Sequence, residues 1–136
     1  LYQVDIIPME LVLVQAANES AWGTSRFARI GLNFFGLWCY KKGCGMVPNG
    51  RESGATHEVE KFDSLNHAMA RYFQYLNSSA NYKKLRRMRA ELRAENKRIE
   101  PSVIASGLTS YSARGNDYVV ELQSMLRHNE RFLTAE

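Results

Sequence analysis

Between residues 31 and 61 the sequence loses the spacing of an amphipathic helix and becomes rich in turn residues. Six glycines and Pro48 interrupt this stretch, and short segments suited to β-strands remain at residues 34–40 and 56–62. On both sides of it, apolar residues recur three and four positions apart, as helices require. The pattern predicts an α+β fold, mostly α, in which a small, flexible β-lobe at about residues 32–62 follows the first two helices.

Five or six helices are expected in all. The first begins at Pro8, whose missing N–H would have no helical partner in a first turn, and it ends near Ser20. This helix is apolar nearly all round, which predicts that it is buried at the centre of the domain. The second lies at about residues 24–30. The later helices are predicted from a cap at Asp63 or Ser64, a stripe from Tyr82 to Leu92, a start at Pro101, and a last segment from about Arg114 to His128.

The 136 residues fit a single domain that spans the whole chain, and an apolar share of 45% can fill its core. No apolar run approaches the ~20 residues that are needed to cross a bilayer. The net charge of +4 favours an anionic partner, such as nucleic acid, anionic lipid or an acidic wall polymer, without choosing among them. Because the chain starts at Leu1, close to an apolar helix, we expect upstream sequence with any signal peptide or membrane anchor to precede it.

Cys39 and Cys44 stand in a loop-like stretch with four residues between them. A local disulfide is one interpretation and would fit an oxidising compartment, whereas two reduced thiols in a cytosolic protein are the other. A structural zinc site is the least favoured, because zinc takes four ligands and only His57 lies near in sequence. We therefore expect no metal and no cofactor, and we keep the two cysteines as a candidate disulfide.

A carboxylate follows directly on the first apolar helix, because Glu19 stands three residues before Trp22 and a terminating Gly23. Apolar surroundings disfavour the charged carboxylate, and the negative end of a helix does the same, so both raise its pKa. A raised pKa keeps the proton on Glu19 near neutral pH, as general-acid catalysis at a glycosidic oxygen requires; lysozyme works by this logic. The alternative is a solvated carboxylate at the helix end.

Four segments extend this feature along the chain in a fixed order. They read LVLVQAANESAWGTSRFA, NFFGLW, KFDS and LTSYSARGNDYVVEL. Together they resemble the endo-β-N-acetylglucosaminidases of glycoside hydrolase family 73, which include flagellar-rod peptidoglycan hydrolases and autolysins. The resemblance covers positions 8 to about 125. It implies a lysozyme-like fold with a helical lobe, a β-lobe and a glycan-binding groove between them.

The resemblance also implies roles for single residues. It gives Glu19 the role of general acid, and it places Tyr111 in the groove, where the hydroxyl would orient a water or the acetamido group of the substrate. A core tyrosine is the alternative for Tyr111, and packing is the favoured role of Tyr118. The segment that would face the glycan comprises Asn33, Phe34 in place of the usual leucine, Phe35 and Gly36. Apart from the resemblance, Trp22, Trp38 and Tyr40 are candidates for stacking on sugar rings, and packing in the core is the alternative for all three.

The sequence departs from the family pattern at the second carboxylate, because the usual "TTEY"-like strand is missing. The β-lobe offers Glu52, Glu58 and Glu60 instead. Strand alternation puts Glu58 and Glu60 on one face, opposite His57, and that face is expected to meet solvent. We favour Glu58 as the second catalytic carboxylate and keep Glu52, at a predicted loop tip, as the alternative. A solvated surface carboxylate is the competing interpretation for both.

Six basic residues cluster at positions 83–93 around an apolar helical stripe. The first interpretation is a solvated helix face; the second is attraction to an anionic wall polymer or membrane surface, which salt would weaken. No nucleic-acid-binding motif accompanies the cluster, so nucleic acid is not expected as a partner. The six residues are Lys83, Lys84, Arg86, Arg87, Arg89 and Arg93.

The predicted function is hydrolysis of the glycan strand of peptidoglycan at N-acetylglucosamine, by a monomeric enzyme of the periplasm or cell exterior. The developing positive charge on the sugar would be met by a β-lobe carboxylate or by the substrate's own 2-acetamido oxygen. A lytic transglycosylase or muramidase acting on the same substrate is one alternative, although the "GLMQ"-type stretch of those enzymes is missing. A non-catalytic module that binds wall glycan is the other.

Overall fold

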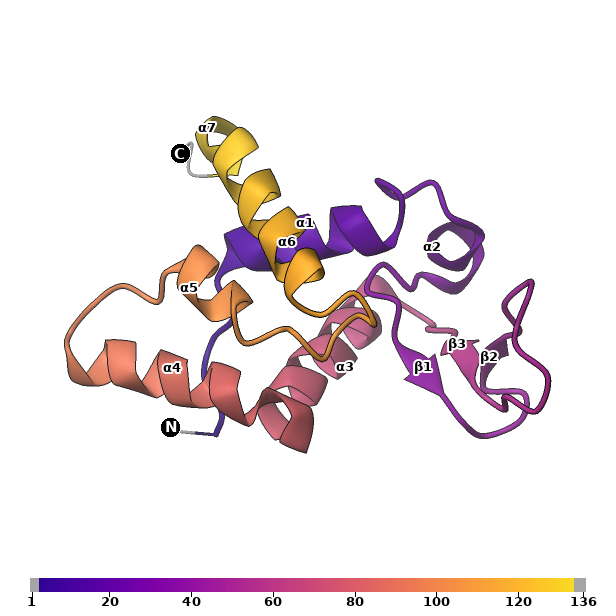
Figure 1. Ribbon diagram of the computed structural model, residues 1–136. Helices are drawn as coiled ribbons and strands as arrows, with labels where there is room; N and C mark the ends of the chain where they lie inside the picture. Colours follow the sequence, from indigo (N-terminus) through magenta and orange to yellow (C-terminus); the bar gives the residue numbers. More distant parts are fainter. Residues whose placement is uncertain (1–2, 134–136) are drawn as a thin grey trace. The chain divides into compact units, whose positions relative to one another are not determined.

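The computed structural model describes residues 3–133, and Figure 1 shows their arrangement into helices and a small sheet. The chain divides into two compact units. The helical unit combines the residues up to Gln15 with those from Phe73 onward, and the β unit is Ala16–Tyr72. The elements are α1 (Met9–Glu19), α2 (Arg26–Gly31), β1 (Trp38–Cys39), β2 (Gly45–Met46), β3 (Glu58–Glu60), α3 (Leu65–Ser78), the 3-10 helix η1 (Ala80–Tyr82), α4 (Lys83–Ala94), α5 (Pro101–Ala105), α6 (Asn116–His128) and α7 (Glu130–Leu133).

The predicted α+β class, mostly α and of the lysozyme-like kind, is confirmed. The single domain expected for the whole chain and the groove between its lobes stay predictions. Most helix starts also agree with the sequence signals: the Ser64 hydroxyl accepts a hydrogen bond from His67 N at 3.0 Å as α3 begins, and Pro101 opens α5. Within residues 3–133, no helix combines the length and the apolar character that a membrane crossing needs.

The β unit contains an antiparallel sheet of strand order β1-β3-β2, in which Trp38 pairs with Val59 and Gly45 with Glu60. The predicted strand segments contain β1 and β3, but β2 was not predicted. Strand β2 was missed because a glycine in a sequence usually indicates a turn, whereas Gly45 here allows two strands to approach closely. A side-chain carbon added at Gly45 would lie 2.0 Å from the carbonyl oxygen of Val59, so the strand accepts only glycine at this position.

Helix α1 begins where predicted, since the carbonyl of Pro8 accepts the first helical hydrogen bonds from Leu11 N and Val12 N. The prediction that the helix is buried all round is wrong for one side. Leu13 is 48% exposed, and Met9, four residues earlier on the same face, is also exposed. The residue that is fully buried instead is polar: Gln15 donates from Nε2 to the hydroxyl of Tyr118 at 3.0 Å in the helical unit.

Two members of the 83–93 basic cluster lie inside the helical unit, so a solvated face describes only part of it. Arg89 is fully buried and donates to the carbonyls of Gln3, Asp5 and Ile6, at 3.1 Å each. Arg86 is buried as well and donates to backbone carbonyls at the end of α3. Arg93 binds the Asp5 carboxylate through two hydrogen bonds, which hold the Asp5 pKa at about 2. A buried guanidinium group needs such partners. The bonds of Arg89 and Arg93 hold the segment before α1 against α4.

Candidate active site

Helix α1 ends at Glu19 in a tight turn that Ser20 holds. The Ser20 hydroxyl donates to the Ala16 carbonyl at 2.5 Å and accepts from Gly23 N at 2.8 Å. Ala21, Trp22 and Gly23 all have positive φ, at 51°, 58° and 81°. A left-handed conformation costs a non-glycine residue on the order of 1 kcal/mol or more, and such strain is typical of functional sites. Trp22 is 70% exposed in this turn, whereas Glu19, at the end of the helix, is half-buried.

The NFFG segment meets Glu19 at its glycine. A side-chain carbon added at Gly36 would lie 3.1 Å from Oε1 of Glu19 and 3.9 Å from Cδ, so the peptide backbone borders the carboxylate directly. Gly36 also has a φ of +68°, which favours glycine for a second, independent reason. Asn18 Nδ2 approaches the other carboxylate oxygen at 3.5 Å. Two segments that the sequence analysis singled out separately are therefore neighbours in the β unit.

The structure places Asn33 and Phe35 inward rather than on a glycan-facing surface. Asn33 is 2% exposed, and its amide group forms four hydrogen bonds to backbone groups of the β unit. The Phe35 ring is buried and stacks on Tyr72 with ring centres 4.2 Å apart. Phe34 is half-buried and lies 3.6 Å from where a side chain at Gly23 would begin. Within this segment Gly36 is exposed and Phe34 partly so, and these two remain available to a ligand.

Glu58 is buried, contrary to the expectation that its strand face meets solvent. It is 5% exposed, and its two carboxylate oxygens accept hydrogen bonds from Gly43 N at 3.0 Å and from Gly45 N at 2.9 Å. These bonds, that from Gly43 first, hold the pKa of the carboxyl below its ordinary range. Glu60 pairs with Arg71 at 3.3 Å, and Glu52 is exposed in a turn closed by Ala55. The geometry shows that Glu58 holds the end of the loop between β1 and β2.

Replacing Glu58 by glutamine should make the protein less stable, and the difference should depend on pH. Because the folded protein binds the Glu58 proton less readily than the unfolded chain, this group stabilises the fold fully above the ordinary glutamate pKa of about 4.3. The contribution is lost as the pH falls through the lower, folded-state value. Thermal unfolding of wild type and Glu58→Gln from neutral to acid pH should show the gap in Tm closing. A gap that stays constant over this pH range would contradict the assignment.

Aromatic side chains and the two cysteines lie in β1 and in the loop between β1 and β2. Trp38 is half exposed and stacks on His57, with ring centres 3.6 Å apart and planes 12° from parallel. Tyr40, two residues later, is also exposed. Cys39 and Cys44 form a disulfide across the loop that precedes β2. Strand β1 and the disulfide-closed loop after it therefore each expose an aromatic ring to solvent, Trp38 and Tyr40.

The two tyrosines of the last motif belong to the helical unit. Tyr111 is half-buried, stacks parallel to Tyr118 at 5.9 Å between ring centres, and has edge or tilted contacts with Tyr75 and Tyr82. Tyr118 is buried and its hydroxyl accepts the hydrogen bond of Gln15. Tyr118 is thus a core residue, as the favoured interpretation had it, whereas Tyr111 keeps one partly accessible side.

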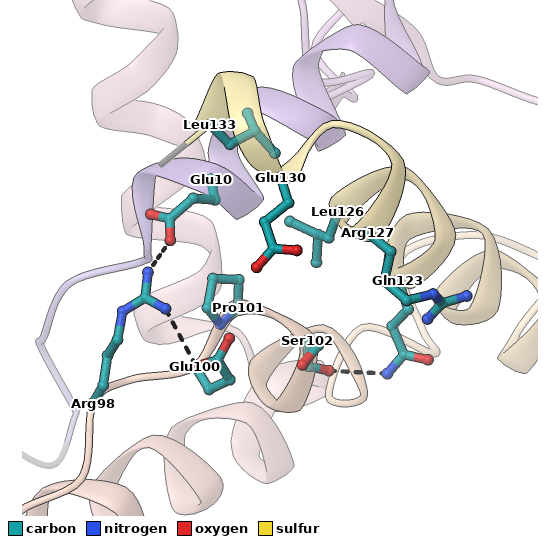
Figure 2. Close-up of a pocket in the computed structure, with 10 residues that line it drawn as sticks. All are labelled: Glu10, Arg98, Glu100, Pro101, Ser102, Gln123, Leu126, Arg127, Glu130 and Leu133. Atoms are coloured by element: carbon teal, nitrogen blue, oxygen red, sulfur yellow. Dashed lines mark hydrogen bonds and ion pairs between the residues drawn. The ribbon is translucent and has the colours of Figure 1, made fainter. Parts of the chain in front are cut away.

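The helical unit also has a shallow pocket that the sequence did not suggest (Figure 2). Arg98 lies between the carboxylates of Glu10 and Glu100 and pairs with both, while Glu130 points toward the pocket centre. Its volume is about 120 Å³, well below the roughly 300 Å³ at which ligand sites for small organic molecules begin. A sugar unit of a glycan strand would not be enclosed here, so this pocket is not the candidate active site.

The comparisons with known proteins agree with the motifs. Residues 2–131 match the Glucosaminidase family, described as mannosyl-glycoprotein endo-beta-N-acetylglucosaminidase. The chain is 34% identical over 135 residues to Protein bax of Escherichia coli (strain K12). This match includes 99% of the chain but 47% of that protein, so the chain spans about half the length of this relative. No solved structure matches. The family match over nearly the whole chain shows that it belongs to the glucosaminidase family of glycoside hydrolases.

Proposed function

We propose that this chain hydrolyses the glycan strand of peptidoglycan at N-acetylglucosamine, with Glu19 as the general acid. The observation that carries the proposal is the approach of Gly36 to the Glu19 carboxylate, next to the strained turn at Ala21 and Trp22. A carboxyl group bordered by backbone on one side and partly exposed on the other can give its proton to a leaving-group oxygen. Its raised pKa, expected from the sequence, stays a prediction.

The charge that develops on the sugar needs a second group. Both oxygens of Glu58 are engaged by backbone amides, and Glu60 is paired with Arg71, so neither is free to approach a sugar without giving up these bonds. This supports a substrate-assisted route, in which the 2-acetamido oxygen of N-acetylglucosamine attacks the anomeric carbon as Glu19 protonates the leaving oxygen. Glu52 remains the alternative among the β-lobe carboxylates that we considered, because its side chain is exposed.

The exposed rings of the β unit supply sugar contacts in this proposal. Trp22, Trp38 and Tyr40 are more than half exposed, and aromatic faces suit the apolar faces of sugar rings. Tyr111, with one accessible side, would orient the acetamido group or a water. The disulfide supports an oxidising compartment, so we place the protein in the periplasm or outside the cell, acting as a monomer. Exposed members of the basic cluster, such as Lys83 and Lys84, would favour contact with anionic wall polymer.

Digestion of purified sacculi, followed by mass spectrometry of the released fragments, tests this function. Hydrolysis at N-acetylglucosamine should give fragments with that sugar at a reducing end, each one water heavier than the corresponding anhydro product. A 1,6-anhydro product would assign the chain to the lytic transglycosylases instead. Sedimentation of the protein with sacculi and release of no fragments would assign it to the non-catalytic wall-binding modules.

A further inference from the structure

We infer that Asn33 is a positioning residue for Glu19, an inference that rests on the proposed role of Glu19 as the acid. Asn33 does not touch the carboxylate. It fixes the Asn33–Leu37 turn, and that turn carries Gly36, the residue whose backbone borders Glu19 Oε1. The position of the acid would then depend on a buried amide three residues before the point of contact.

All four hydrogen bonds that an asparagine side chain can form are present in this turn. Oδ1 accepts from Phe35 N and from Leu37 N, both at 3.2 Å. Nδ2 donates to the carbonyls of Leu37 and Glu60, both at 2.9 Å. Because an amide has two donor hydrogens and two acceptor lone pairs, its capacity is filled. A fully satisfied buried polar network holds the backbone in one conformation.

The turn is also fastened at its ends to other parts of the β unit. Asn33 N donates to the carbonyl of Phe27 at 3.0 Å, and Glu60 N donates to the carbonyl of Leu37 at 2.9 Å. Between these points the Phe35 ring is stacked on Tyr72. Gly36 is the exposed residue of a segment whose other members are buried or partly buried. The turn therefore forms a rigid wall, and the wall limits the positions that the Glu19 carboxylate can take.

Two variants test the inference. Asn33→Asp keeps both acceptor interactions and loses both donors, while Asn33→Ser shortens the side chain and loses most of the network. With soluble uncross-linked glycan strands as substrate, each should lower kcat about 100-fold, the effect of moving a catalytic group by about 1 Å, with KM changed less than about twofold. In parallel, the ¹³C carboxyl resonance of Glu19, assigned by its disappearance in Glu19→Gln, should titrate at a different pH than in wild type.

Ser64→Ala provides the matched control, because it removes the hydroxyl that caps α3 and weakens the β unit without touching the turn. It should leave kcat and the Glu19 titration unchanged. An Asn33 variant that folds and keeps the wild-type kcat and the wild-type Glu19 titration would overturn the inference. If Glu19→Gln stays active, the proposed function fails, yet the titration still reports whether Asn33 positions Glu19.

A measurement on the wild type covers the case in which neither Asn33 variant folds. The amides of Phe35 and Leu37 donate to Asn33 Oδ1, so hydrogen exchange should find them as protected as the amides of the sheet, such as Glu60 N. Exchange of both at the rate of an open loop would show that the turn is not fixed, and would overturn the inference.

Discussion

Glu19→Gln should fold like wild type and release fragments from sacculi about 100- to 10,000-fold more slowly, the range that general acid–base catalysis contributes. The amide has nearly the same shape as the carboxyl but cannot give a proton to the leaving oxygen. Neither the Ser20 turn nor the Gly36 contact depends on a negative charge, and an amide oxygen can still accept the 3.5 Å hydrogen bond from Asn18. The rate at which reducing ends are released measures the loss of activity, and the Tm of thermal unfolding shows whether the variant folds like wild type.

Glu10→Gln is the control for this prediction. This variant makes the same carboxyl-to-amide change on the same helix. Glu10, however, pairs with Arg98 in the helical unit. Its activity should equal that of wild type. If Glu19→Gln retains activity within a few-fold of Glu10→Gln, the acid is another residue and the proposed mechanism has to be abandoned.

Gly36→Ala should lower kcat several-fold although the acid itself is unchanged. The added methyl group would lie 3.1 Å from Oε1, tighter than most contacts of this kind, so the carboxylate has to move away by a few tenths of an ångström, less than the ~1 Å that costs about 100-fold. The positive φ adds a cost in stability of about 1–2 kcal/mol. Steady-state kinetics on soluble glycan strands and chemical unfolding separate the two effects.

Gly50→Ala isolates the contact from the backbone strain. Gly50 has a φ of +72°, close to that of Gly36, but among residues 3–133 nothing lies within 4 Å of an added side chain there. It should lose comparable stability and keep its kcat. Equal kinetics for the two variants would mean that Gly36 does not border a working carboxylate.

Local signals predicted the helices well, because capping and proline act within a few residues. Ser64 and Pro101 mark the starts of α3 and α5 in the sequence as they do in the structure. The position of Glu19 at the end of α1 was predicted for the same reason, because the apolar helix and the glycine after it are close to Glu19 in sequence. The family motifs then placed Gly36 in the site without showing how near it comes to the carboxylate.

The misjudged residues bond to backbone groups whose positions are set only in the folded chain. Arg89 looked like part of a solvated face, but its partners are backbone carbonyls more than 80 positions away. Glu58 was expected in solvent because strand alternation gives two faces without telling which is covered. Its partners, Gly43 N and Gly45 N, come within reach only when β2 has paired with β3. Asn33 likewise is recognisable as a structural residue only from the folded turn.

The loop between β1 and β2 is held in two chemically independent ways. One is the covalent bond between Cys39 and Cys44. The other is the Glu58 carboxylate, which accepts hydrogen bonds from the backbone amides of Gly43 and Gly45, the two neighbours of Cys44. Reducing agents break the first and leave the second intact, whereas acid weakens the second and leaves the first intact. A single chemical stress thus removes one of these two restraints at a time, and reduction in acid removes both from the loop that carries Tyr40.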